Sequence, residues 1–160
     1  MNQSHYWGVE SNQALFDAGV SVELMQAGVA ADRGHFVVND RFDLTTVPHR
    51  FEYAISQSLF ARLALNGVAR VIVNVTRQLA PDGRFFASWF DNPDPQCFEP
   101  IARGGRLTTF PDREPYHYSF DVLANLCLAL GVHAERLEQA GHPRGESVMV
   151  ITRRAPPREA

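Results

Sequence analysis

Four short stretches of the sequence carry side chains that could do chemistry, at points where strands are expected to end or a long loop closes. Glu10 follows the first apolar run, and Asp40 follows the second. Ser56 and Gln57 follow the third, and an aromatic triplet at residues 116–118 closes a proline-rich stretch. Because open α/β sheets bind ligands outside the carboxyl ends of their strands, these positions are the candidate site residues.

Glu10 lies between the apolar run at residues 6–9 and a helix-like stretch. A carboxylate at the end of such a strand can accept hydrogen bonds from both hydroxyls of a ribose, as the acid after the second strand does in dinucleotide-binding folds. The alternative is a solvated acid stabilised by the dipole of the following helix. We favour the ribose interpretation.

Three small polar residues, Ser56, Gln57 and Ser58, follow the third apolar run. At the carboxyl end of a strand they could line a ligand site, but side chains of this kind also cap helices. We favour capping for Ser58, while both interpretations stay open for Ser56 and Gln57.

The triplet Tyr116, His117 and Tyr118 could line a pocket for a reacting molecule, with His117 as a base. The alternative is that these aromatic side chains anchor the long loop before them to the core. We favour anchoring, because buried aromatic rings contribute much apolar surface to a core.

The first half of the chain has the periodicity of strands alternating with helices. Strands are expected at residues 6–9, 35–39 and 51–56, the last two in the interior of a sheet. A first helix is expected to end at Gly28 and to pack one apolar stripe on the sheet, made by Leu15, Ala18, Val22 and Met25. The strongest helical pattern follows, with apolar residues at 65, 68, 72, 75 and 79.

The second half continues with a type I turn at residues 80–83 and a strand at 84–90. Periodicity then fails from residue 91 to 118, as in a lid, a binding loop or a locally disordered segment. Ser119 is expected to cap a helix that Gly131 ends. Two strands at 133–137 and 147–152 follow, and their short connection requires them to be antiparallel.

This order predicts one α/β domain over residues 1–154, in which helices cover both sides of a largely parallel sheet. A tail at residues 155–160 is rich in proline and charge, and is expected to be disordered. A chain of 160 residues is long enough for one sizeable core and too short for two ordinary domains.

Composition excludes several classes of function. The formal net charge is −3 and the basic residues are scattered, so a nucleic-acid partner is not expected. Cys97 and Cys127 are thirty positions apart without the spacing of a metal site or a disulfide framework. No apolar stretch reaches the roughly 18 residues of a membrane span. We therefore expect a cytoplasmic protein without membrane or metal partners.

Four stretches in this order resemble motifs of class I S-adenosylmethionine (SAM) dependent methyltransferases. Residues 6–10 are similar to the second strand with its terminal acid, and residues 39–44 to the acidic turn after the third strand. Residues 51–60 resemble the fourth strand and the start of the next helix. Residues 79–85 resemble the family's L-x-P-G-G-x-x start of the fifth strand.

The resemblance implies a three-layer, mostly parallel Rossmann-like sheet that ends in an antiparallel hairpin. It implies SAM as cofactor, with its ribose held by Glu10 and its adenine by Asp40, shielded by Phe42. For Asp40 a plain turn role is an equal alternative, because an Asn-Asp pair suits turns. Ser56 and Gln57 would complete the cofactor site, and the aromatic triplet would face the methyl acceptor, expected to be a small molecule.

The family's first strand and its glycine-rich turn have no counterpart before His5. We therefore expect an N-terminally incomplete sheet and a chain that by itself binds SAM weakly or not at all. A non-catalytic remnant or partner protein that binds no cofactor is the alternative. An NAD-dependent oxidoreductase shares the acid after the second strand, but the antiparallel end of the sheet argues against it. The acceptor and the oligomeric state stay open.

Overall fold

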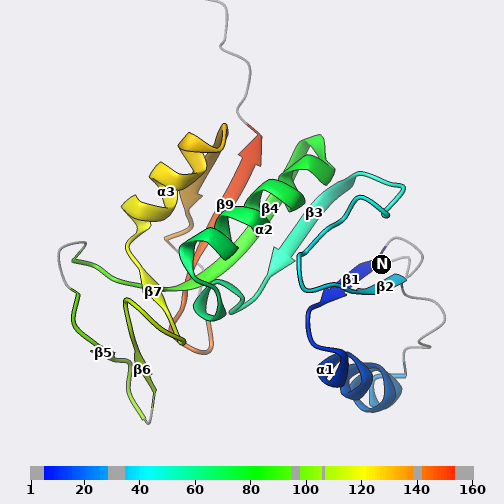
Figure 1. Ribbon diagram of the computed structural model, residues 1–160, viewed down its shortest axis with the longest axis horizontal. Coiled ribbons are helices and arrows are strands. Elements are labelled where there is room, and N and C mark those ends of the chain that lie inside the picture. The colour runs from blue at the N-terminus through cyan, green and yellow to red at the C-terminus, as the bar shows by residue number, and fades with distance from the viewer. Residues whose placement is uncertain (1–5, 29–34, 95–97, 106, 139–141, 154–160) are drawn as a thin grey trace, which may run out of the picture. The chain divides into compact units, whose positions relative to one another are not determined.

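A computed structural model describes residues 6–28, 35–94, 98–105, 107–138 and 142–153, with His35 described by its backbone alone. The chain divides into two compact units, unit 1 at Met1–Thr46 and unit 2 at Val47–Ala160. Each unit is described by itself (Figure 1). The expectation of one domain stays a prediction, and the expected tail lies outside the described residues.

Unit 1 contains a parallel pair of strands, β1 (Trp7–Glu10) and β2 (His35–Val38), as the sequence predicted. Helix α1 (Gln13–Ala18) begins at Asn12, whose side chain accepts hydrogen bonds from the backbone N–H groups of residues 14 and 15. It continues into a π-helix, η2 (Gly19–Leu24). Phe36 on β2 contacts Tyr6 and Phe16 edge to face, at centroid distances of 6.0 and 5.8 Å.

The expected apolar stripe of this first helix is not buried in the structure. Leu15 is 52% exposed, Val22 48% and Met25 70%, and the fourth member, Ala18, is also exposed. Phe16 makes the helix's aromatic contact with the sheet instead. The prediction was wrong because Leu15 and Ala18 are exposed within α1 itself, so this apolar face does not meet the strands. From Gly19 the π-helical hydrogen bonding also moves Val22 and Met25 away from a 3.6-residue spacing.

Unit 2 is built on a sheet with the order β3-β4-β9-β8. Parallel strands β3 (Phe51–Ser56) and β4 (Leu79–Asp91) are followed by β9 (Ser147–Arg153) and β8 (Val132–Arg136), which are antiparallel to each other. Strand β9 is also antiparallel to β4, so the expected hairpin end is confirmed. The short strand β7 (His117–Tyr118) pairs with the end of β4.

Two helices cover one face of this sheet, α2 (Leu65–Gln78) and α3 (Phe120–Ala129), which lie next to each other (Figure 1). Both agree with the sequence periodicity, and Ser119 caps α3 by accepting a hydrogen bond from the Val122 N–H group. The core between helices and sheet contains Val68, Val71, Ile72, Phe85, Ala87, Trp89, Leu123, Cys127, Met149 and Ile151.

Within residues 91–118, where periodicity failed, the chain forms small elements. Strands β5 (Ile101–Ala102) and β6 (Thr108–Thr109) pair as an antiparallel hairpin, and β7 closes the segment. A 3₁₀-helix, η4 (Phe60–Arg62), connects β3 with α2. No helix among the described residues has the length and apolarity that a membrane crossing requires.

The turn expected at residues 80–83 is instead a bulge inside β4. Phe51 pairs with Leu79 and Tyr53 pairs with Arg84. The chain therefore advances two residues along β3 but five residues along β4 between these pairs, which makes β4 bulge. Gly83 permits this bulge, because a Cβ atom there would lie 2.8 Å from the Phe51 carbonyl oxygen.

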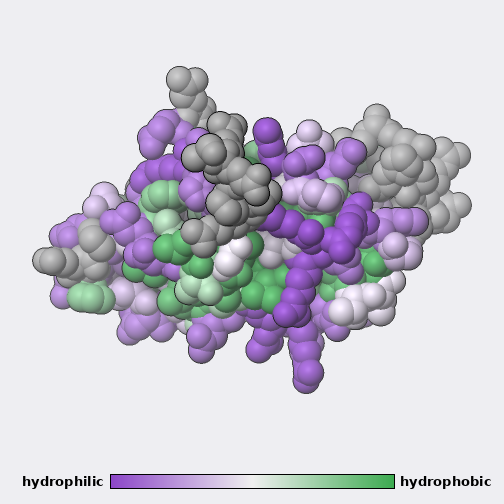
Figure 2. Space-filling view, turned by 90° about the horizontal axis from the view of Figure 1, so that it is seen from above, coloured by the Kyte–Doolittle hydropathy of each residue, from purple (hydrophilic) through white to green (hydrophobic). Residues whose placement is uncertain are grey.

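The expectation that residues 35–39 and 51–56 form interior strands is also wrong. Strands β2 and β3 each end the sheet to which they belong, within the part of the chain that is described. Tyr53 is 65% exposed and Ile55 is 78% exposed on β3. The space-filling view shows patches of apolar residues among hydrophilic ones on the face that it presents (Figure 2). Continuous apolar runs therefore did not distinguish an edge strand from an interior one.

Substituting Gly83→Ala should destabilise unit 2 by about 1–3 kcal/mol, because the added methyl group meets backbone atoms that cannot move aside. Chemical denaturation measures the change. Gly19→Ala is the control, since a Cβ atom at Gly19 has no neighbour within 4 Å and its backbone is helical. Equal stability of the two variants would show that the bulge does not require glycine.

Candidate functional site

The carboxyl end of β4 gathers residues from four parts of unit 2. Because β3 and β4 are parallel, residues 56–58 and the end of β4 lie at the same edge of the sheet. Strand β9 begins there, since Ser147 pairs with Trp89, and β7 pairs with Phe90 and Asp91. The structure therefore brings Ser56 and Gln57 to the same edge as the triplet at residues 116–118.

A buried carboxylate lies at this edge. Glu146 is 4% exposed, and its Oε1 accepts a hydrogen bond of 2.6 Å from Ser58 Oγ. Its Oε2 accepts a second hydrogen bond from Ser88 Oγ. Ser88 Oγ in turn accepts a hydrogen bond of 2.7 Å from the Ser58 N–H group. These three residues, here called the Glu146 network, join the turn after β3, strand β4 and the start of β9.

Gln57 and His142 extend the Glu146 network toward solvent. Gln57 is exposed, and its Nε2 lies 3.2 Å from His142 Nε2, which is 3.9 Å from Glu146 Oε2. The Arg144 N–H group donates to His142 Nδ1 at 3.3 Å. Ser56 is different, because its buried hydroxyl has no hydrogen-bond partner among the described residues.

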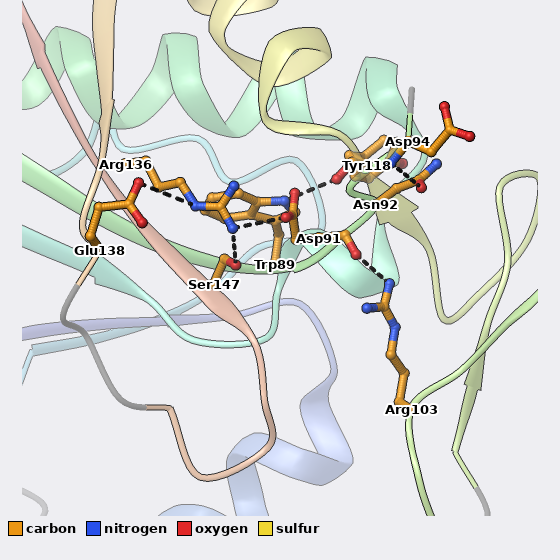
Figure 3. Close-up of polar contacts among 9 residues, drawn as sticks. All are labelled: Trp89, Asp91, Asn92, Asp94, Arg103, Tyr118, Arg136, Glu138 and Ser147. Atoms are coloured by element: carbon orange, nitrogen blue, oxygen red, sulfur yellow. Dashed lines mark hydrogen bonds and ion pairs between the residues drawn. The ribbon is translucent and has the colours of Figure 1, made fainter. Parts of the chain in front are cut away.

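A second polar cluster surrounds Asp91 (Figure 3). Arg136 Nη2 donates to Asp91 Oδ2 at 2.8 Å and to Ser147 Oγ at 3.1 Å, and its guanidinium lies over the Trp89 ring. From the other side, Arg103 donates to the Asp91 carbonyl oxygen. Asp91 Oδ1 is buried and has no partner among the described residues. A cavity of about 110 Å³ adjoins the cluster, lined by Asp91, Asn92, Pro93, Ser119, Phe120, Asp121 and Arg136.

His117, the candidate base, is 3% exposed. Its Nδ1 lies 3.0 Å from Thr109 Oγ1, while its Nε2 has no partner within the described ranges. Burial lowers the pKa of His117 below 6.5, the nearby Arg103 lowers this pKa further, and a hydrogen bond with Thr109 opposes both. The imidazole is therefore neutral near pH 7, as a proton acceptor must be.

The two tyrosines of the triplet hold the loop against η4. The Tyr116 N–H group donates to the Ala61 carbonyl oxygen at 2.7 Å, and Tyr118 Oη donates to the Leu63 carbonyl oxygen at 2.6 Å. Their rings stack at a centroid distance of 6.0 Å, and burial raises the pKa of Tyr118. These contacts are those of the anchoring interpretation, and a part in an acceptor pocket stays a prediction.

In unit 1, Glu10 binds the turn that starts α1. Its Oε1 accepts hydrogen bonds from the Ser11 N–H group at 2.7 Å, the Asn12 N–H group at 2.9 Å and Ser11 Oγ at 3.3 Å. No group among the described residues donates to Oε2. One carboxylate oxygen is therefore used locally, and the other can accept a hydrogen bond from a ligand.

Asp40 lies at the same end of the unit 1 sheet, because the Asn39 N–H group donates to the Glu10 carbonyl oxygen at 2.9 Å. The turn is held by Asn39 and Asp43, which accept hydrogen bonds from Arg41 and Thr45. The Asp40 side chain is exposed and takes no hydrogen bond from the described residues. Phe42, also in this turn, is half-buried with a positive φ of 53°.

Sequence reasoning missed Glu146, Asp91, Arg136 and His142 as residues of this edge. The available signal was position, since Glu146 directly precedes the last expected strand and Asp91 directly follows the strand expected at residues 84–90. Only the pairing of β4 with β9 shows that these two positions share an edge.

Comparison with solved structures identifies the fold. A SAM-dependent methyltransferase from Clostridium acetobutylicum superposes on 92% of this chain and 74% of its own, with a TM-score of 0.65 and 8% identity. The methyltransferase CcbJ from Streptomyces caelestis covers 94% and 75%, with a TM-score of 0.68 and 14% identity. The glycopeptide N-methyltransferase MtfA, in complex with SAM, covers 93% and 77%, with a TM-score of 0.62 and 15% identity.

This chain has the methyltransferase fold. The fold expected from the four sequence motifs is thereby confirmed, over both units of the chain. No protein-family model and no curated protein matches the sequence. At 8–15% identity, the three likenesses establish the architecture of the methyltransferase fold and not the activity.

The free energy of unfolding should fall as the pH decreases below about 6.5, because the unfolded chain then binds a proton that buried His117 resists. His117→Gln should reduce this slope. Urea denaturation between pH 5 and 7 measures it. His133→Gln is the matched control, since it removes an exposed histidine from β8 and should leave the slope in place. An unchanged slope in the His117 variant would assign the pH dependence to another group.

Proposed function

We propose that this protein is a SAM-dependent methyltransferase that acts on a small-molecule acceptor. The observation that carries the proposal is Glu10 at the end of β1, whose Oε2 accepts no hydrogen bond from the described residues, in a chain with the methyltransferase fold. Two neighbouring hydroxyls of a ribose could donate to such a carboxylate. The neighbour MtfA was solved with SAM, which supports the same cofactor here.

The donor and acceptor groups of the candidate residues fit parts of SAM. Glu10 would hold the ribose, and Asp40, which has no bond within the turn, would accept from the adenine amine beside Phe42. Ser56 and Gln57, at the end of β3, would offer a hydroxyl and an amide to polar groups of the cofactor. The bound cofactor supplies a sulfonium methyl group that is open to displacement.

Methyl transfer forms a bond between the acceptor and the methyl carbon while the bond from sulfur to that carbon breaks, which leaves S-adenosylhomocysteine (SAH). The protein's main task is to align the acceptor, which is worth more than a dedicated acid or base. His117, neutral and with a free Nε2, would take the acceptor's proton where one is released. Tyr116 and Tyr118 would form one wall of the acceptor pocket.

A small-molecule acceptor is supported by the neighbour MtfA, which is a glycopeptide N-methyltransferase. The cavity of about 110 Å³ beside Asp91 is not lined by residues 116–118 and is smaller than a typical ligand pocket, so it does not identify the acceptor. The basic residues near it do not form a binding face either, because Arg136 and Arg103 are both engaged by Asp91.

A second candidate function is that of a non-catalytic protein that keeps the fold and binds no cofactor. It is favoured by the three local hydrogen bonds to Glu10 Oε1 and by the anchoring contacts of Tyr116 and Tyr118, all of which are explained without a ligand. Cofactor binding distinguishes the two functions.

We expect this chain to bind SAH more weakly than micromolar, so saturation-transfer NMR is the appropriate measurement. The proposal predicts transfer to the adenine and ribose protons of SAH, with displacement by SAM and not by NAD. Absence of any transfer at about 1 mM SAH, a concentration that reports binding of about −4 kcal/mol, would favour the non-catalytic protein.

Glu10→Gln should weaken SAH binding roughly tenfold, because a ribose hydroxyl donates more strongly to a charged carboxylate than to an amide. The same NMR titration measures the change. Glu23→Gln is the control, since Glu23 is an exposed acid on η2 of the same unit. Equal affinity of the Glu10 variant and the control would remove Glu10 from the cofactor site.

A further inference from the structure

The turn after β3 is held by residues that are far from it in the sequence. Ser88 is 30 positions and Glu146 is 88 positions away from Ser58, yet both bind it. The N–H group of Ser58 donates to one of them and its hydroxyl to the other. Both polar groups of Ser58 are therefore fixed by the Glu146 network.

Ser58 needs this support because of its backbone. Its φ is 57°, in the left-handed region that residues other than glycine rarely adopt. Such a conformation persists where surrounding contacts determine it, and it often occurs at functional sites. Without the two hydrogen bonds, the turn is expected to return to a right-handed or extended conformation.

The carboxylate of Glu146 is suited to hold the turn. It is buried, so its charge requires donors, and the two serine hydroxyls supply one for each oxygen. Hydrogen bonds to a charged acceptor are stronger than bonds between neutral groups. Removing the charge therefore loosens both serines together.

The turn at residues 56–58 exposes the side chain of Gln57 at the carboxyl edge of the sheet and does not bury it in the core. Gln57, between Ser56 and Ser58, is exposed at the carboxyl edge of the sheet, and its amide touches His142. Any change in the φ of Ser58 redirects the backbone next to Gln57. The network thus connects a buried charge to an exposed polar group at the edge where ligands bind.

We propose that Glu146 is a positioning residue, which fixes the turn at residues 56–58 in its ligand-binding conformation and thereby controls cofactor affinity. This inference rests on the proposed function for its ligand. Glu146 acts through Ser58 and Ser88 and does not itself touch the cofactor. The strained turn keeps this conformation in the absence of a ligand, because the Glu146 carboxylate holds it.

The test compares Glu146→Gln with the wild-type chain by amide hydrogen exchange and by SAH titration. Exchange at the Gln57 and Ser58 amides should become at least about tenfold faster, while amides of the ladder between β4 and β9 keep their protection. The dissociation constant for SAH should rise by a similar factor. Glu135→Gln is the control, since it replaces an exposed acid of β8 and should change neither quantity.

Ser58→Ala provides a milder variant in case Glu146→Gln does not fold, because it removes the hydroxyl that Glu146 binds and leaves the hydrogen bond from the residue 58 N–H group to Ser88 Oγ in place. Unchanged exchange at the turn in either folded variant overturns the positioning role. Faster exchange with unchanged SAH affinity overturns the link to the ligand. Failure of the wild-type chain to bind SAH overturns the proposed function and the ligand part of this inference, while the exchange data still decide whether Glu146 holds the turn.

Discussion

The hydrogen bonding of β4 determines which side chains of unit 2 can meet. This strand is parallel to β3 and β7 and antiparallel to β9. The carboxyl ends of β3 and β7 and the start of β9 therefore lie at the same edge of the sheet. Its core face is fixed by the burial of Phe85, Ala87 and Trp89. A slip of one residue would turn these side chains to the other face and remove Ser88 from Glu146. The polar networks at the edge therefore depend on apolar packing beneath them.

The sequence predicted most elements of this fold because each leaves a local periodicity. The strand at Phe51–Ser56, the helix at Leu65–Gln78 and the antiparallel final strands were expected within a residue or two. The errors arose where local pattern and tertiary context differ. The apolar spacing of the first helix did not predict the π-helix after Ala18. The proline-glycine pattern at residues 80–83 predicted a turn, whereas the chain forms a bulge beside Phe51.

The candidate site could be predicted only in part, for a similar reason. Glu10, Asp40, Ser56 and Gln57 were proposed as site residues because each lies at the end of an apolar run, which is a local signal. The bonds of Glu146 to Ser58 and Ser88, and that of Asp91 to Arg136, join positions separated by 45 to 88 residues. Such contacts are set by strand pairing, and no spacing rule within a single sequence shows them.

A protein that aligns two molecules for displacement depends on the rigidity of its turns more than on the reactivity of one side chain. The described edge of unit 2 agrees with this requirement. Its charged groups, Glu146, Asp91 and Arg136, are occupied in holding backbone and side chains of this edge in place. The groups left without partners are neutral ones, such as Ser56 Oγ and His117 Nε2, and a single carboxylate oxygen of Asp91. The charged groups of this edge thus hold the structure, while the polar atoms without a partner among the described residues are buried.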